Sequence, residues 1–373
     1  MPDLPAKRTV VPRRRRYAVS AALGTVAAAV LGLALWSMAG VTAAYRGVTP
    51  AAAAAAAPAP RPLVIYHAPF VRYERARAVP VLVYHEMNNG CAPSAPVCKA
   101  ADPETVSTAQ FRAEMAYMFS RGYHTVTMAQ YQAWLGNRKT RLPSRPVLIT
   151  ADNGIWSFLS GAQPVLAGYG YTAVAAVVTG FADGAGGHCA PRIGGVSVQP
   201  GCPRDNAGWD ATWAQLRSLD PRVWEFILEA GPSGHYVQDY DPHCRMFDAC
   251  LLPGETVAQY QVRLAAELGG GETALAARLG SRVNPGGWVV PYSDLGYPRC
   301  AQGDCTPQDA TIPQGYLVNY ADAHFRAVFV EDASRNAIGH ERFRFDVNGP
   351  DTEASFQSQL AAFTAAGAFD RSR

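Results

Sequence analysis

The fold is decided by the stretch Arg145–Phe158, which reads RPVLITADNGIWSF. A proline and four apolar or β-branched residues precede the sequence Ala-Asp-Asn-Gly, a pattern that predicts a buried strand ending in a tight turn. Asp152 then stands at the carboxyl end of that strand, the edge where α/β sheets and barrels carry their active sites. Because Asp, Asn and Gly also suit an ordinary turn, a purely structural role for Asp152 stays open at this point.

Strand and helix patterns alternate on both sides of this stretch. Helices are indicated after Ser107, Thr127 and Thr256, each followed three residues later by Gln, and we expect Gly269–Gly271 to interrupt the third helix. Further strands are predicted at Val79–His85, Thr172–Thr179, Val223–Leu228, Trp288–Tyr292, Ala327–Val330 and Arg342–Val347, and a final helix at Thr352–Ala366. This alternation indicates a parallel α/β architecture.

Three motifs resemble those of the polysaccharide deacetylases, carbohydrate esterase family 4. Val79–Met87 (VPVLVYHEM) is similar to the opening strand of that family, and Thr150, Asp152 and Gly154 match its Thr-Phe-Asp-Asp-Gly motif. Trp288–Tyr292 (WVVPY) looks like the Trp-Pro-Tyr form found in poly-N-acetylglucosamine deacetylases. The resemblance implies a distorted (β/α) barrel over residues 78–373, with an open doubly wound sheet as the alternative.

The resemblance also implies chemistry and residue roles. Asp152 stands where the family has a general base that activates water, and a divalent metal, zinc first, would polarise the acetyl carbonyl. Asn153 occupies the position of the metal-binding aspartate, although an uncharged amide is a poorer ligand. Glu229 falls where the first histidine ligand is expected, with His235 as the nearest candidate for the second and His243 as a weaker one. The resemblance further assigns substrate contacts to His85, Trp288, Pro291 and Tyr292.

Two functions remain open from the sequence. The first is metal-assisted hydrolysis of N-acetyl groups, a reaction on non-peptide carbon–nitrogen bonds, on a cell-surface or cell-wall polysaccharide. The second is a catalytically degenerate domain that binds glycan or acts as a scaffold at the membrane. Asn153 and Glu229 favour the second, as does the absence of the arginine that orients the base in the family's third motif, where this chain has Val289 or Val290.

The amino-terminal region predicts export. Residues 1–16 form a basic tail with six Lys or Arg residues against one Asp, whereas the rest of the chain is nearly neutral and shows no nucleic-acid-binding patch. Residues 17–45 lack charge and are long enough, at about 1.5 Å per residue, to span a bilayer core of about 30 Å. They predict a membrane helix with a cytoplasmic amino terminus, or else a cleaved secretory signal. Residues 46–77 form an Ala/Pro-rich linker to the domain outside the cytoplasm.

The cysteines agree with export, because an even number in an exported chain favours disulfides. Each couple of neighbouring cysteines closes a short loop, so we expect four local disulfides. None has the Cys-x-x-Cys spacing of a zinc ribbon. The couples are Cys91 with Cys98, Cys189 with Cys202, Cys244 with Cys250, and Cys300 with Cys305.

Overall fold

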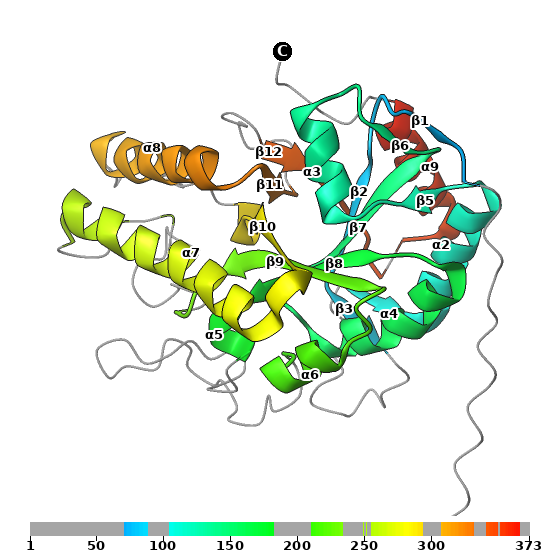
Figure 1. Ribbon diagram of the computed structural model, residues 1–373, viewed down its shortest axis with the longest axis horizontal. Coiled ribbons are helices and arrows are strands. Elements are labelled where there is room, and N and C mark those ends of the chain that lie inside the picture. Colours follow the sequence, from blue (N-terminus) through cyan, green and yellow to red (C-terminus); the bar gives the residue numbers. More distant parts are fainter. Residues whose placement is uncertain are drawn as a thin grey trace, which may run out of the picture. The chain divides into compact units, whose positions relative to one another are not determined.

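A curved parallel sheet forms the centre of the protein (Figure 1). The computed structural model describes residues 71–88, 104–182, 210–233, 249, 251, 255–293, 307–331, 341–349 and 351–365. In spatial order the main strands are β12 (Glu341–Phe343), β11 (Ala327–Val330), β10 (Val283–Val289), β9 (Trp224–Ala230), β8 (Ala173–Val178), β7 (Pro146–Ala151), β2 (Val81–Tyr84) and β13 (Phe345–Asp346). The predicted parallel α/β architecture is therefore confirmed.

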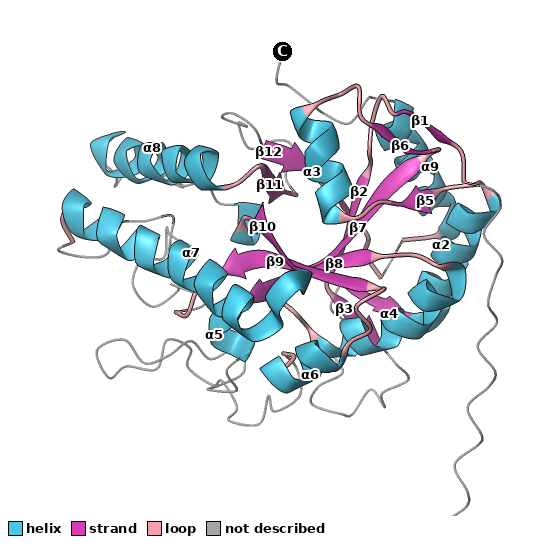
Figure 2. Ribbon diagram, viewed as in Figure 1, coloured by secondary structure: helices cyan, strands magenta, loops and turns pink. Residues whose placement is uncertain are grey.

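Shorter strands and the helices complete the described structure. β5 (His124–Thr125) pairs with β7, β1 (Tyr73–Arg75) pairs with β6 (Arg141–Pro143), and β3 (Glu86–Asn88) pairs with β4 (Thr105–Ser107). The helices are α2 (Thr108–Ser120), α3 (Met128–Gly136), α4 (Trp156–Tyr169), α5 (Thr179–Ala182), α6 (Trp213–Ser218), α7 (Val257–Leu279), α8 (Pro307–His324) and α9 (Glu353–Ala365), most of which surround the strands in Figure 2. Two 3₁₀ turns, η1 (Gly280–Arg282) and η2 (Pro291–Ser293), flank β10.

The two ends of the sheet meet at one residue, Arg344. β12 pairs with β11 and β13 pairs with β2, and only Arg344 separates β12 from β13 along the chain. The Arg344 N–H donates to the Val330 carbonyl at 2.9 Å, and the Val347 N–H donates to the Val83 carbonyl at 3.0 Å. One short segment therefore joins both edges of the sheet, which fits the predicted barrel and not an open sheet.

The sheet separates two hydrophobic clusters. The larger one lies between the strands and the outer helices, whereas the smaller one combines residues such as Leu148 and Ile227 with Met128, Tyr131 and Trp134 of α3. The Met128 N–H donates to the Glu225 carboxylate, near the start of β9, at 2.6 Å. α3 thus closes the amino-terminal end of the barrel with apolar side chains, and the carboxyl-terminal end is left for polar groups.

Local sequence signals placed most elements correctly. Thr127 and Thr256 form the expected capping boxes, and Ser107 accepts a hydrogen bond from the Gln110 N–H. The predicted strand at Trp288–Tyr292 was wrong in its bounds, because β10 ends at Val289 and η2 follows it. Tyr292 and Ser293 have positive φ angles of 55° and 54°, which a strand does not allow.

The prediction that Gly269–Gly271 interrupt a helix was also wrong, since α7 runs unbroken through them. The glycines serve close packing of α7 on the strand beside it. A Cβ built on Gly271 would lie 2.6 Å from Leu228 Cδ1 and 3.2 Å from Gly231 Cα. Tertiary packing against β9 therefore outweighs the low intrinsic helix propensity of glycine.

Several sequence predictions fall outside the described residues. These include the basic tail, the membrane segment, most of the linker, all eight cysteines, His235 and His243. β1 lies within the last residues of the predicted linker. None of the helices in the described ranges combines the length and apolarity needed to cross a membrane.

We predict that Gly271→Ala destabilises the protein by about 1–3 kcal/mol, the usual cost of overpacking, because its methyl group would collide with Leu228. Gly270→Ala is the matched control, since the nearest atom to its Cβ would be Pro232 Cγ at 3.8 Å. That change should be neutral or stabilising, because alanine is the better helix former. Urea unfolding of both variants checks the prediction, and equal effects at the two positions would contradict it.

Candidate active site

Asp152 follows directly from the end of β7 and is buried, with 3 % of its surface exposed. Alternate residues of a strand share one face, so Leu148, Thr150 and Asp152 all face the barrel interior. Leu148 belongs to the apolar cluster below, whereas Thr150 and Asp152 are polar. The Asp152 N–H donates to the Tyr84 carbonyl at 2.9 Å, and Asn153 then turns the chain with φ 61°. The predicted position of Asp152 at the carboxyl end of a central strand is confirmed.

Arg344 forms a two-pronged ion pair with Asp152. Its Nη1 lies 2.5 Å from Asp152 Oδ1, and its Nη2 lies 2.6 Å from Oδ2. Nη1 also donates to Thr150 Oγ1 at 3.2 Å, and Nη2 donates to Glu331 Oε1 at 2.8 Å. The guanidinium side chain is fully buried. This geometry fixes the plane of the Asp152 carboxylate and balances its charge inside the barrel.

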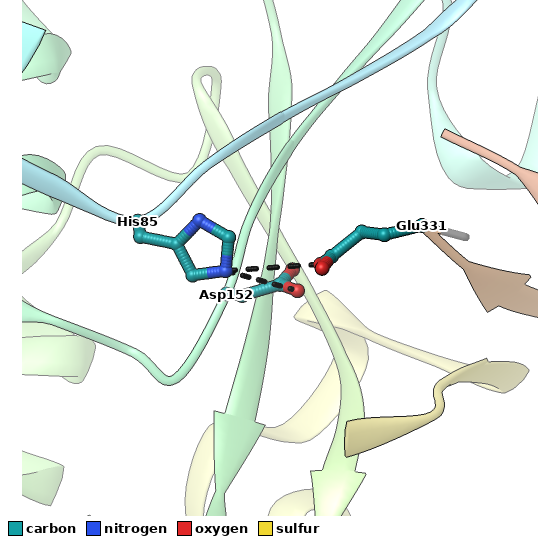
Figure 3. Close-up of side chains that lie close together, drawn as sticks. All are labelled: His85, Asp152 and Glu331. Carbon is teal, nitrogen blue, oxygen red and sulfur yellow. Dashed lines mark ion pairs between the residues drawn. The ribbon is translucent and has the colours of Figure 1, made fainter. Parts of the chain in front are cut away.

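His85 and Glu331 complete the cluster around Asp152 (Figure 3). His85 follows β2, and its Nε2 lies 3.9 Å from Asp152 Oδ2 and 3.7 Å from Glu331 Oε1. Its other ring nitrogen, Nδ1, lies 3.7 Å from Asp346 Oδ1. Glu331 follows β11, where its N–H donates to Ser293 Oγ at 2.7 Å. Strands far apart in the sequence thus bring an imidazole and three carboxylates together.

The surroundings push the pKa values of these groups in opposite directions. Burial opposes ionisation of Asp152, but the Arg344 guanidinium outweighs burial and lowers the pKa of this carboxyl. Burial would lower the pKa of His85, but the carboxylates of Glu331 and Asp152 outweigh it and raise that pKa above its ordinary value of 6.5. Burial raises the pKa of Glu331 to about 7. The site therefore favours the ionised form of Asp152 and, relative to a free imidazole, the protonated form of His85.

Asn153 and Glu229, two of the predicted metal ligands, lie together and are hydrogen-bonded to each other. The Asn153 amide Nδ2 donates to Glu229 Oε1 at 2.8 Å, and the Asn153 backbone N–H donates to Glu229 Oε2 at 2.5 Å. Glu229 lies near the end of β9 with 3 % of its surface exposed. Burial, with the nearby charge of Asp152, raises the pKa of Glu229 well above its ordinary value.

The donor set fits a divalent metal poorly. His85, Asp152 and Glu331 each offer a ligand atom within 4.8 Å of the others, the one such cluster in the described part of the chain. However, the Arg344 guanidinium donates to both oxygens of Asp152 and to one oxygen of Glu331, so a cation bound there would lie beside a buried positive charge. Both Glu229 oxygens are engaged by Asn153.

The predicted substrate residues other than His85 lie in β10 and in the 3₁₀ turn η2 that follows it. Trp288 is fully buried; its Nε1 donates to the Glu229 carbonyl at 2.9 Å, and its ring stacks on Phe325 at 5.3 Å. Pro291 is buried in η2, and Tyr292 beside it is half-buried. Trp288 thus holds the backbone of Glu229 through this hydrogen bond. Tyr292 is the more accessible of the two aromatic residues.

The sequence interpretation missed Arg344 and Glu331. The expected arginine was sought near Trp288, but it comes instead from the segment where the barrel closes. A signal was present in Arg342–Asp346 (RFRFD), where charged residues alternate with phenylalanines. In a strand predicted to lie in a barrel, this alternation places Arg344 and Asp346 on one face.

Comparison with known proteins confirms the resemblance to polysaccharide deacetylases. The chain is 26 % identical over 209 residues to the poly-β-1,6-N-acetyl-D-glucosamine N-deacetylase of Escherichia coli strain K12, and equally to that of strain O157:H7. The match covers 52 % of this chain but only 29 % of each relative, so the chain spans less than a third of their length. No protein-family model matches the chain.

The fold agrees with a solved structure. A de-N-acetylase from Aggregatibacter actinomycetemcomitans superposes with a TM-score of 0.54 and 19 % sequence identity, covering 75 % of this chain and 98 % of that one. The similarity supports the curved (β/α) architecture that the sequence predicted.

We predict that Arg344→Met lowers the free energy of unfolding by about 3–5 kcal/mol, because it leaves the buried charge of Asp152 without its partner. Adding Asp152→Asn should recover part of this loss, since the unpaired charge is then removed. The matched control is Arg222→Met, because Arg222 forms an exposed ion pair with Asp220 that should contribute little. Urea unfolding measures all three variants, and equal losses for the two Arg→Met changes would contradict the assignment.

Proposed function

We propose that this chain, a divergent relative of the polysaccharide deacetylases, hydrolyses N-acetyl groups on a cell-surface or cell-wall polysaccharide. The observation that carries the proposal is the 3.9 Å approach of His85 Nε2 to Asp152 Oδ2, two groups whose pKa values are displaced in opposite directions. Such a pair supplies an acid and a base at the same pH. The named activity of the curated relatives supports N-acetylglucosamine polymers as the substrate class.

The reaction needs one water molecule and two proton transfers. Each Asp152 oxygen keeps a lone pair beyond the one that accepts from Arg344, so the carboxylate can still accept a proton from water. The water oxygen attacks the acetyl carbon while Asp152 takes the proton. Protonated His85 then gives its proton to the amide nitrogen as the carbon–nitrogen bond breaks. The products are acetate and a free amine on the sugar.

Arg344 and Glu331 position these two groups. Arg344 fixes the plane of the Asp152 carboxylate. Among the neighbouring charges, that of Glu331 contributes most to raising the pKa of His85. The resemblance implies a divalent metal, with zinc as the first choice. Because the carboxyl groups of Asp152, Glu331 and Glu229 accept hydrogen bonds from Arg344 or Asn153, the steps above use only the chain's own side chains.

We further propose that the domain acts outside the cytoplasm, anchored in the membrane by residues 17–45 or released by cleavage after them. The uncharged stretch behind a basic tail and the eight cysteines that follow it support this location. The polysaccharide would then be reached from the membrane surface.

Binding of glycan without turnover is the second candidate, because Asn153 and Glu229 replace residues that the resemblance would assign to a metal. Under this hypothesis the barrel mouth recognises acetylated sugars and releases no acetate. Acetate release and glycan binding must therefore be measured on the same preparation.

Asp152→Asn should reduce acetate release from β-1,6-linked N-acetylglucosamine oligomers by about 10²–10⁴-fold, the usual contribution of a general base. Glycan binding should be retained, because the change preserves the shape of the side chain. Asp220→Asn is the control, since Asp220 pairs with the exposed Arg222 at the far end of β9. Release from the wild type that persists in Asp152→Asn would contradict the assigned base. Tight binding with no release by the wild type would favour the second candidate.

Acetate release should fall as pH rises through the pKa of His85, because the acid must be protonated and this pKa is raised above 6.5. Glu331→Gln removes the largest charge that raises it, so the descending limb of the pH–rate profile should move to lower pH. The amide oxygen can still accept from Arg344, which preserves the local structure. A descending limb that stays in place would show that His85 is not the titrating acid.

A further inference from the structure

We propose that this site works without a divalent cation: the Asn153–Glu229 pair fills the position where the resemblance places the metal, and Arg344 supplies the positive charge beside Asp152. The inference rests on the proposed function for its setting, but its evidence is the hydrogen bonding of the donor groups. The proposed site needs no metal, whereas the resemblance implies a divalent metal.

The amide group of Asn153 faces the carboxyl group of Glu229. An Asn and a Glu side chain that share a cation must both present an oxygen atom to it. Asn153 presents its NH₂ group to Glu229 Oε1 at 2.8 Å, and this group has no lone pair for a metal. The backbone N–H of Asn153 occupies the other carboxylate oxygen at 2.5 Å. Asn153 and Glu229 therefore bind each other in the place of a shared cation.

The Asn153–Glu229 pair also holds the turn after β7 in position. Asn153 has a φ of 61°, in the left-handed region that side-chain-bearing residues adopt rarely. Glu229 binds both the amide and the backbone of this residue, while Trp288 Nε1 fixes the Glu229 carbonyl from the other side. The Glu229 carboxyl thus stabilises the turn that aims Asp152. Metal binding by Glu229 would remove that support.

The buried positive charge of Arg344 opposes a second cation beside Asp152. Arg344 Nη1 and Nη2 lie 2.5 and 2.6 Å from the two Asp152 oxygens, and Nη2 also reaches Glu331 Oε1 at 2.8 Å. A cation bound to Asp152, at the roughly 2.0–2.2 Å usual for zinc and oxygen, would lie against this buried guanidinium. Like charges at such separations repel strongly in a buried site. The guanidinium thus occupies the electrostatic position of the metal.

The test compares cation responses of the full chain, purified in detergent. Zinc content is measured by mass spectrometry of the purified protein, and thermal unfolding is recorded in EDTA and in zinc chloride. For the wild type we expect no zinc that depends on Glu229 or Asp152, and a Tm that is the same in EDTA and in zinc. For Asn153→Asp, two carboxylates would face each other, so the variant should unfold at a lower temperature in EDTA and recover by roughly 5 °C in zinc.

Asn137→Asp is the control, because it adds a carboxylate where the Asn137 side chain only accepts a hydrogen bond from the exposed Lys139 N–H. It should show no zinc response. An equal response of this control would overturn the assignment to Asn153, as would a zinc-insensitive Asn153→Asp. Wild-type zinc that is lost in Glu229→Gln, Asp152→Asn or Glu331→Gln would overturn the whole inference, whereas zinc that remains in all three variants lies outside this cluster and supports it.

Acetate release separates this inference from the proposed function. Release that continues in EDTA supports both. Release that needs zinc and is lost together with bound zinc in Glu229→Gln keeps the proposed function and overturns the cation-free site. No release under any condition, with zinc binding absent as expected, removes the proposed function and leaves the cation-free site standing.

Discussion

The buried pairing of Arg344 with Asp152 is the interaction on which the rest of the site depends. It joins the strand that carries the carboxylate to the segment that closes the sheet, so the same contact completes the barrel and orients the base. A buried charge of either sign alone would cost several kcal/mol, and each of these residues removes that cost for the other. Glu331 and then Asp152 raise the pKa of His85, whereas burial raises the pKa of Glu331 against the effect of Arg344.

The layering of the barrel interior explains why the polar groups lie at one end. α3 fills the amino-terminal end with Met128, Tyr131 and Trp134, and Leu148 continues the apolar layer. Thr150 begins the polar layer by donating to the Leu82 carbonyl at 2.8 Å while it accepts from Arg344. This order shields the ion pair from water on the side of α3.

What could be predicted from the sequence was local. The strand before Asp152, the capped helices and the alternation of elements each depend on residues close in the chain, and the structure confirms them. Arg344 could not be assigned, because it reaches Asp152 from 192 residues away and only barrel closure brings them together. Asn153 and Glu229 were predicted as metal ligands, and they lie together, but their mutual hydrogen bonds depend on the orientation of an amide, which no sequence pattern reveals. The continuity of α7 through three glycines was missed because it depends on the shape of β9.

The central claim is that hydrogen bonds and a guanidinium organise this site in the place of a metal. Anomalous diffraction at the zinc absorption edge, from crystals grown with zinc, tests it most directly. The account predicts no anomalous peak within coordination distance of Asp152, Asn153 or Glu229, with Arg344 on both Asp152 oxygens and the Asn153 amide on Glu229. A zinc peak bound to Asp152 or Glu229, with Arg344 or Asn153 displaced, would contradict it.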